Sequence, residues 1–147
     1  MLGGVAAQPL VSTVAASARQ EIIWAGSYLR DPLLAEALRR KVLEGVNVYL
    51  LTSPYTYLDP QSYFLTLYLA GAHLYLGAPQ KYVLVVDGVA RLEGRGVGVP
   101  GESVRAPRSP AATLREVQEA LAKAQRLTAS PTEVVHELLR RSPKRRP

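Results

Sequence analysis

The chain of 147 residues is long enough for one domain with a hydrophobic core, and its 48% hydrophobic content excludes a wholly disordered protein. It contains no cysteine, which excludes disulfides, thiolate metal sites and cysteine nucleophiles, and its two histidines lie too far apart in sequence to indicate a zinc site. The formal net charge of +6 arises in residues 105–147, because basic and acidic residues balance in residues 1–104.

The composition also bears on the source and the location of the protein. Arginine outnumbers lysine, asparagine occurs once and Met1 is the only methionine, a pattern typical of thermophilic proteins. No segment approaches the about 20 consecutive apolar residues that cross a membrane, and the uncharged stretch before Arg19 lacks the basic start of a signal peptide. We therefore expect a cytoplasmic protein without a membrane segment, a metal or a cofactor.

Residues 9–92 predict alternating helices and strands. Asp31-Pro32 and Asp59-Pro60 are both typical of a helix start, because Asp caps the first turn and Pro fits its first position. Compact apolar runs between the helices are typical of buried strands. The predicted order is a helix over residues 9–18, a strand over 21–25, a helix from Asp31 to Gly45, a strand over 46–51, an aromatic loop over 53–58, a helix from Asp59 to Gly71, and strands over 73–76, 82–86 and 89–92. This order indicates an α/β layer fold.

The C-terminal part has a different composition. Residues 94–110 combine glycine, proline and arginine, which indicates a loop. Apolar residues at helical spacing predict a helix over residues 113–127, and Ser130-Pro131 begins a second helix. The expected organisation is an α/β module over 1–98, a loop over 99–110, two helices over 111–141 and a disordered basic tail over 142–147.

The segment 80–87, Gln-Lys-Tyr-Val-Leu-Val-Val-Asp, resembles the motif of the phospholipase D-like superfamily, in which His-x-Lys-x4-Asp lies on a strand. The order of elements from Val11 to Gly98 resembles one module of that superfamily as well. Short matches support the resemblance, namely Tyr28 after the first strand, Asp31 before a helix, Gly45-Val46-Asn47-Val48, and Ala70-Gly71-Ala72-His73. The resemblance implies a mixed sheet flanked by helices, here with a C-terminal helical extension.

In that superfamily the motif's histidine attacks the phosphodiester or protonates the leaving group, and its lysine holds the phosphate. Counting back from Asp87, the histidine position is Gln80 and the lysine position is Tyr82. A register shifted by one makes Lys81 the lysine but places Pro79 at the histidine position. An amide cannot form the covalent phospho-enzyme, so Gln80, Tyr82 and Asp87 are expected to be vestigial rather than catalytic.

Several residues remain candidates for binding. Gln80, Lys81 and Arg95 are expected to dock an anion, and the glycine-rich segment 94–98 is either a further anion cradle or a plain flexible loop. His73 is interpreted as a strand histidine bound to a carbonyl or facing solvent, with a ligand contact as the alternative. Tyr55 and Tyr57 are better placed for stacking on bases, or for an interface, than the other tyrosines.

The basic C-terminal region indicates a nucleic-acid partner, since arginines near a phosphate backbone gain affinity by releasing counterions. Its candidate residues are Arg140, Arg141, Lys144, Arg145 and Arg146. The alternative is a solvated tail that only aids solubility.

We therefore expect a catalytically degenerate phospholipase D-like protein with a non-catalytic role in nucleic-acid binding or assembly. The alternatives are a metal-independent phosphodiesterase or nuclease with altered catalytic residues, and a purely structural partner protein. Because single-motif members of the superfamily pair to complete one site, the resemblance implies a homodimer or a pairing with a paralogue.

Overall fold

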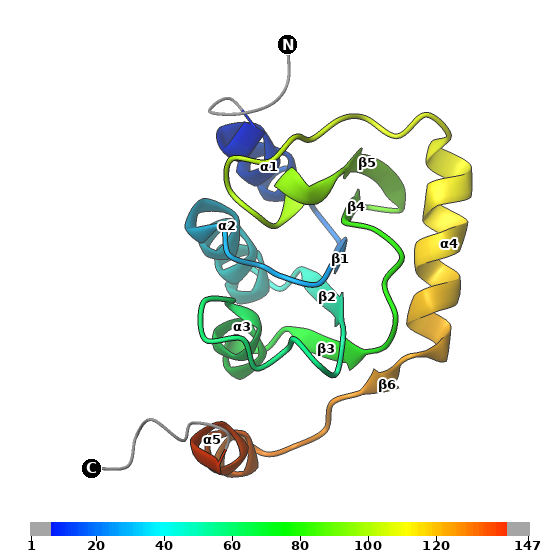
Figure 1. The fold of residues 1–147 in the computed structure, drawn as a ribbon. Coiled ribbons are helices and arrows are strands. Elements are labelled where there is room, and N and C mark those ends of the chain that lie inside the picture. The colour runs from blue at the N-terminus through cyan, green and yellow to red at the C-terminus, as the bar shows by residue number, and fades with distance from the viewer. Residues whose placement is uncertain (1–6, 141–147) are drawn as a thin grey trace.

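The computed structural model describes residues 7–140 of the chain, and side chains from residue 10 onward. Its centre is a six-stranded sheet in the order β5-β4-β1-β2-β3-β6 (Figure 1). The strands are β1 (Glu21–Ala25), β2 (Asn47–Thr52), β3 (His73–Leu76), β4 (Val83–Val86), β5 (Val89–Glu93) and β6 (Gln125–Arg126). The helices are α1 (Ala7–Ala16), α2 (Pro32–Leu43), α3 (Phe64–Ala70), α4 (Pro110–Lys123) and α5 (Pro131–Arg140), with a 3-10 helix η2 (Arg95–Val97). The predicted α/β class is confirmed.

The sheet is mixed. β1, β2 and β3 are parallel, whereas β4 is antiparallel to β1, β5 is antiparallel to β4, and β6 is antiparallel to β3. The parallel strands need the crossover helices α2 and α3, and the short turn at Asp87-Gly88 is sufficient to connect the antiparallel pair β4–β5. As a result, the carboxyl ends of β1, β2 and β3 and the start of β4 lie at the same edge of the sheet.

The helices cover the two faces of the sheet unequally. Figure 1 shows α1, α2 and α3 on one face and α4 on the other. The larger core lies under α1–α3 and contains Trp24, Phe64 and Leu84, all fully buried. The smaller core lies under α4 and contains Ile23, Val83 and Val117. Because β1 and β4 are buried on both faces, their sequences are continuous apolar runs rather than alternating ones.

Two predicted helix boundaries are wrong. The Asp31 carboxylate caps α2 as expected by accepting the Leu33 N–H at 3.0 Å. The helix predicted from Asp59 begins only at Phe64, because the Asp59 carboxylate binds the Arg30 guanidinium and the Ser62 hydroxyl.

The helix predicted to reach residue 127 ends at Lys123. The next residue, Ala124, is extended, and Gln125–Arg126 then pair with the edge of β3. The open edge of β3 offers backbone hydrogen-bonding groups to the chain, and pairing with them ends the helical pattern one turn early.

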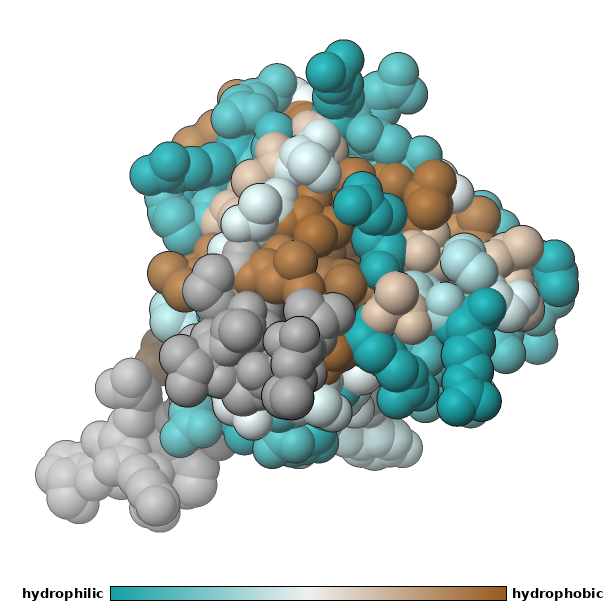
Figure 2. Space-filling view, turned by 90° about the horizontal axis from the view of Figure 1, so that it is seen from above, coloured by the Kyte–Doolittle hydropathy of each residue, from teal (hydrophilic) through white to brown (hydrophobic). Residues whose placement is uncertain are grey.

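The surface is mixed in polarity. Within residues 7–140 no helix is both long enough and apolar enough to cross a membrane. Seen from above in Figure 2, hydrophilic side chains border apolar ones near the middle of that face. Large apolar side chains that are exposed are Leu33 and Leu43 on α2, Tyr55 in the loop after β2, Leu69 on α3, Val89 on β5, and Val135 and Leu139 on α5.

Candidate functional site

The carboxyl ends of the three parallel strands form the edge of the sheet that carries the candidate site. The segments that follow them, residues 26–31, 53–63 and 77–82, meet there. Hydrogen bonds hold them together, since the Gly26 N–H donates to the Leu51 carbonyl at 3.1 Å and the Gly77 N–H donates to the Thr52 carbonyl at 2.8 Å. In open α/β sheets, ligands bind at this edge.

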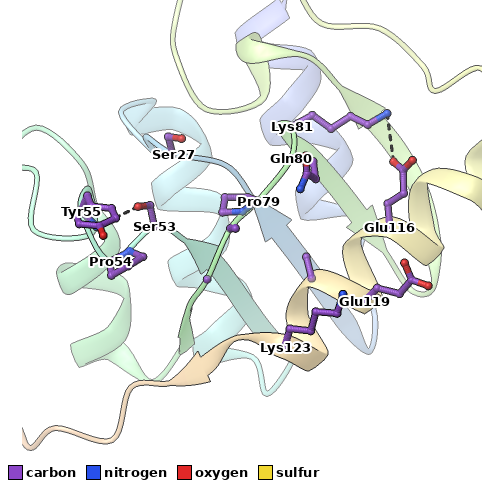
Figure 3. A pocket seen from close by; sticks show the side chains of 13 residues that line it. Ser27, Ser53, Pro54, Tyr55, Pro79, Gln80, Lys81, Glu116, Glu119 and Lys123 are labelled. Carbon is purple, nitrogen blue, oxygen red and sulfur yellow. Dashed lines mark hydrogen bonds and ion pairs between the residues drawn. The ribbon is translucent and has the colours of Figure 1, made fainter.

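A cleft of about 970 Å³ lies between this edge and α4. Figure 3 shows the β2–α3 loop on one side of the cleft and α4 on the other, with Pro79 and Gln80 between them. The side chains lining the two sides are Ser53, Pro54 and Tyr55 from the loop, and Glu116, Glu119 and Lys123 from α4. The α4 residues were not predicted, because polar residues spaced along an amphipathic helix are also typical of an ordinary solvent face.

Gln80 and Lys81, both predicted to bind an anion, line this cleft. The Lys81 Nζ lies 3.5 Å from a carboxylate oxygen of Glu93 and 3.5 Å from one of Glu116. Glu93 is buried and also binds Arg105 at 2.9 Å. Two carboxylates thus offset the charge of Lys81, which weakens its attraction for a phosphate. Gln80 is exposed, and its amide has no hydrogen-bond partner among residues 10–140.

Tyr82 packs on the opposite face of the sheet from Lys81. Its ring meets Trp24 edge to face, with 6.0 Å between centroids and an interplanar angle of 84°, and its hydroxyl accepts the Tyr28 N–H at 3.1 Å. Glycine is required beside it, because a Cβ on Gly98 would clash with the Tyr28 carbonyl oxygen and would lie 2.6 Å from the Trp24 ring and 3.0 Å from the Tyr82 ring. The Tyr82 side chain therefore fills the space between β4 and the loop after β1, and its hydroxyl joins the two segments by a hydrogen bond.

Arg95 lies on the same side of the sheet as Tyr82. Its guanidinium carbon is 5.9 Å from the centroid of the Tyr82 ring, and it is exposed without an ion pair among the residues that the structure describes. The three residues predicted to bind one anion are therefore divided. Gln80 and Lys81 line the cleft beside α4, and Arg95 lies across β4 from them.

The glycine-rich segment 94–98 is an ordered turn that contains η2. The Gly96 N–H donates to the Ser103 carbonyl at 2.8 Å, and the Gly98 N–H donates to the Arg95 carbonyl at 3.1 Å. These donors are occupied within the chain, so they are not available to cradle an anion. Of this segment, the Arg95 side chain remains the candidate for an anion contact.

Asp87 lies at the far end of β4 from the cleft. Its carboxylate accepts the backbone N–H groups of Glu21 at 3.0 Å, Arg19 at 3.0 Å and Gln20 at 2.8 Å. These hydrogen bonds hold the pKa of Asp87 below its ordinary value. Asp87 thus fixes the start of β1 to the β4–β5 turn.

His73 begins β3 and lies at the opposite edge of the sheet from the cleft. Its Nδ1 accepts a hydrogen bond from the Arg126 guanidinium at 3.0 Å, and its ring stacks on Tyr49 with 4.9 Å between centroids. Burial and the charge of Arg126 lower the pKa of His73. The strand position was predicted correctly, but the partner is a guanidinium rather than a carbonyl.

An ion pair fixes the loop that lines the cleft. The Arg30 Nε lies 2.9 Å from a carboxylate oxygen of Asp59, and the Arg30 guanidinium stacks 4.1 Å from the centroid of the Tyr28 ring. Burial raises the pKa of Asp59, but hydrogen bonds from Arg30 and Ser62 outweigh it, so the pKa lies below its ordinary value. This pair joins residues far apart in sequence and had no local signal.

The basic C-terminal residues lie mostly outside the described part of the chain. Arg140 ends α5 and binds Glu137. Arg141, Lys144, Arg145, Arg146 and the predicted disordered tail over 142–147 lie outside the described residues. Among residues 7–140, no group of three His, Asp or Glu side chains could hold a metal ion.

No family model and no curated protein matches this sequence. Solved structures do resemble it. Nuc from Salmonella typhimurium, a phospholipase D family member, is 16% identical with a TM-score of 0.68, over 88% of this chain and 97% of Nuc. NucT from Helicobacter pylori is 15% identical with a TM-score of 0.62, over 81% of this chain and 89% of NucT.

A third similar structure is TrmBL2, an archaeal chromatin protein with a novel mode of DNA binding. It is 17% identical with a TM-score of 0.58, and the match covers 86% of this chain but only 53% of TrmBL2. The sheet order, the flanking helices and these neighbours agree with the resemblance found in the sequence. The chain has the phospholipase D-like fold.

Proposed function

We propose that this protein is a phospholipase D-like domain without phosphodiesterase activity, and that it binds nucleic acid. The proposal rests on the residues found at the histidine and lysine positions of the phospholipase D-like motif. Gln80 occupies the histidine position and cannot attack phosphorus, and Tyr82 occupies the lysine position with its hydroxyl already bound by the Tyr28 N–H. Lys81, the nearest cation, is paired with Glu93 and Glu116.

Two findings support nucleic acid as the partner. Residues 105–147 carry the whole net charge of +6, and TrmBL2, which shares the fold, binds DNA. Residues 140–147 alone carry five positive charges and no negative one. A contact between this segment and a phosphate backbone gains affinity by releasing counterions and therefore weakens as salt increases.

The test measures phosphodiester hydrolysis and nucleic-acid binding on the same protein preparation. We expect no hydrolysis of bis-nitrophenyl phosphate or plasmid DNA without added metal, and salt-dependent binding of a labelled oligonucleotide. Deleting residues 140–147, which carry five positive charges, should make the slope of log K against log salt shallower by up to about 3.5 for single strands or 4.5 for duplexes. Metal-free turnover that is abolished by Gln80→Ala would instead identify an altered phosphodiesterase.

The proposal includes assembly as a homodimer, because single-motif members of the superfamily pair to complete one site. Light scattering after size exclusion should give twice the 16.0 kDa mass of the chain. A protein that forms this dimer but retains no nucleic acid at any salt concentration, with or without residues 140–147, would be a purely structural partner.

A further inference from the structure

The loop wall of the cleft presents an unpartnered aromatic ring. Tyr55 is 91% exposed, and neither its ring nor its hydroxyl has a partner among the described residues. The backbone imposes this position, since the Tyr55 N–H donates to the Ser53 Oγ at 3.0 Å and the Tyr57 N–H donates to the Ser53 carbonyl at 3.1 Å. Tyr57, by contrast, packs against the core. Of the two loop tyrosines predicted either to stack on bases or to form an interface, Tyr55 is the accessible one.

The opposite wall of the cleft has no excess of positive charge. Figure 3 shows Glu116, Glu119 and Lys123 on α4, and the dashed line joins Glu116 to Lys81. The side chains that line the cleft include two lysines and two glutamates. The buried Glu93, which pairs with Lys81, adds a third carboxylate next to the cleft. A phosphate gains little in such a place, which favours an uncharged group as a ligand of the cleft.

Hydrogen-bonding groups on the cleft are free to meet such a group. The Glu119 carboxylate has no ion pair or hydrogen bond within residues 10–140, and the same holds for the Gln80 amide. A carboxylate accepts hydrogen bonds from exocyclic amino groups such as the N4 of cytosine, and an amide can bind the edge of a base as donor and acceptor. An aromatic ring opposite these groups offers a stacking surface.

We infer that the cleft takes an unpaired nucleobase bearing an amino group, stacked on Tyr55 and hydrogen-bonded to Glu119 or Gln80. The base belongs to a single strand rather than to a free nucleotide, because the cleft lacks the positive charge that would hold an isolated phosphate. The phosphates of the strand remain outside, where exposed basic residues meet them. This inference rests on the proposed nucleic-acid binding and adds its strand type and base preference.

The test uses fluorescence anisotropy of labelled oligo(dC), oligo(dT) and a duplex of equal length, and a single strand carrying 2-aminopurine as a stacking reporter. Wild type should prefer oligo(dC) to oligo(dT) and should change the 2-aminopurine emission. Tyr55→Ala should weaken single-strand binding about tenfold, and Tyr55→Phe should match wild type because the ring is retained. Glu119→Gln should reduce the preference for oligo(dC). Both side chains are exposed, so circular dichroism should find these variants folded.

Four results would overturn the inference. If Tyr55→Ala binds single strands as wild type does, or if duplex and single strand bind equally well, the cleft takes no base, although nucleic-acid binding itself would stand. Cytidine monophosphate that displaces oligo(dC) at an equal concentration of bases would make a free nucleotide the ligand. Absence of any salt-dependent retention would remove the proposed function together with this inference.

Discussion

Replacing Tyr82 with Phe tests whether this residue is part of the fold or a hidden nucleophile. The substitution keeps the ring against Trp24 and removes only the hydroxyl that accepts the Tyr28 N–H at 3.1 Å. Losing one such hydrogen bond at a half-buried site should cost about 1 kcal/mol of unfolding free energy. Tyr82→Ala, which also leaves the space beside Gly26 and Gly98 empty, should cost roughly 3–5 kcal/mol.

These losses are large enough to measure by thermal unfolding. For a domain of this size each kcal/mol lowers Tm by about 2–4 °C, so Tyr82→Phe should lower it by about 3 °C and Tyr82→Ala by roughly 6–20 °C. Trp24 is the only tryptophan and touches Tyr82, so its fluorescence follows the unfolding of this junction.

Tyr55→Phe is the matched control, because the Tyr55 hydroxyl has no partner among the described residues, and it should leave Tm unchanged. An unchanged Tm for Tyr82→Phe would refute the structural role of the hydroxyl. Loss of a wild-type phosphodiesterase activity in the same variant would show that Tyr82 does chemistry.

Three further predictions concern stability. Gly98→Ala should destabilise the protein by about 1–3 kcal/mol in urea unfolding, since its Cβ would clash with the Tyr28 carbonyl oxygen and lie 2.6 Å from the Trp24 ring; a neutral effect would contradict the packing described. Burial raises the pKa of Asp31, so its contribution to stability is fully present below the unfolded pKa of about 3.9 and is lost as pH rises through the folded value. The stability of Asp31→Asn relative to wild type, measured as the urea midpoint, should therefore increase from acid to neutral pH. Backbone hydrogen bonds lower the pKa of Asp87, so its contribution to stability is present above about pH 4 and is lost as pH falls through the folded value. Asp87→Asn should therefore be less stable than wild type at neutral pH. If the difference in stability between the two proteins did not shrink in acid, the stabilising role of the Asp87 carboxylate would be contradicted.

Local signals were sufficient for most of the fold. The apolar run of β1 and the Asp31-Pro32 cap of α2 each mark their element within the local sequence. The predictions failed where a distant residue competes with the local pattern. Arg30 binds Asp59 and delays the start of α3, and the edge of β3 pairs with Gln125–Arg126 and ends α4. The thermophilic source and the cytoplasmic location stay predictions.

The candidate site was predicted in part. The motif-like segment singled out Gln80 and Lys81 just before the strand predicted over 82–86, and both residues line the cleft. The sequence alone could not assign Lys81 to the α4 side and Arg95 to the other, because this depends on which face α4 covers. Glu119 reaches the cleft only after a connection passes around the edge strand, so no local spacing joins it to residues 80–81.

The unequal helical layers have a consequence for how the molecule opens. In the described part of the chain, seven buried apolar residues form the core under α4 and 22 form the core under α1–α3. Detaching α4 exposes the smaller set, so transient release of this helix costs less than opening the layer of α1–α3. Its amides should therefore take up deuterium earlier than those of α2, and each release would uncover the floor of the cleft.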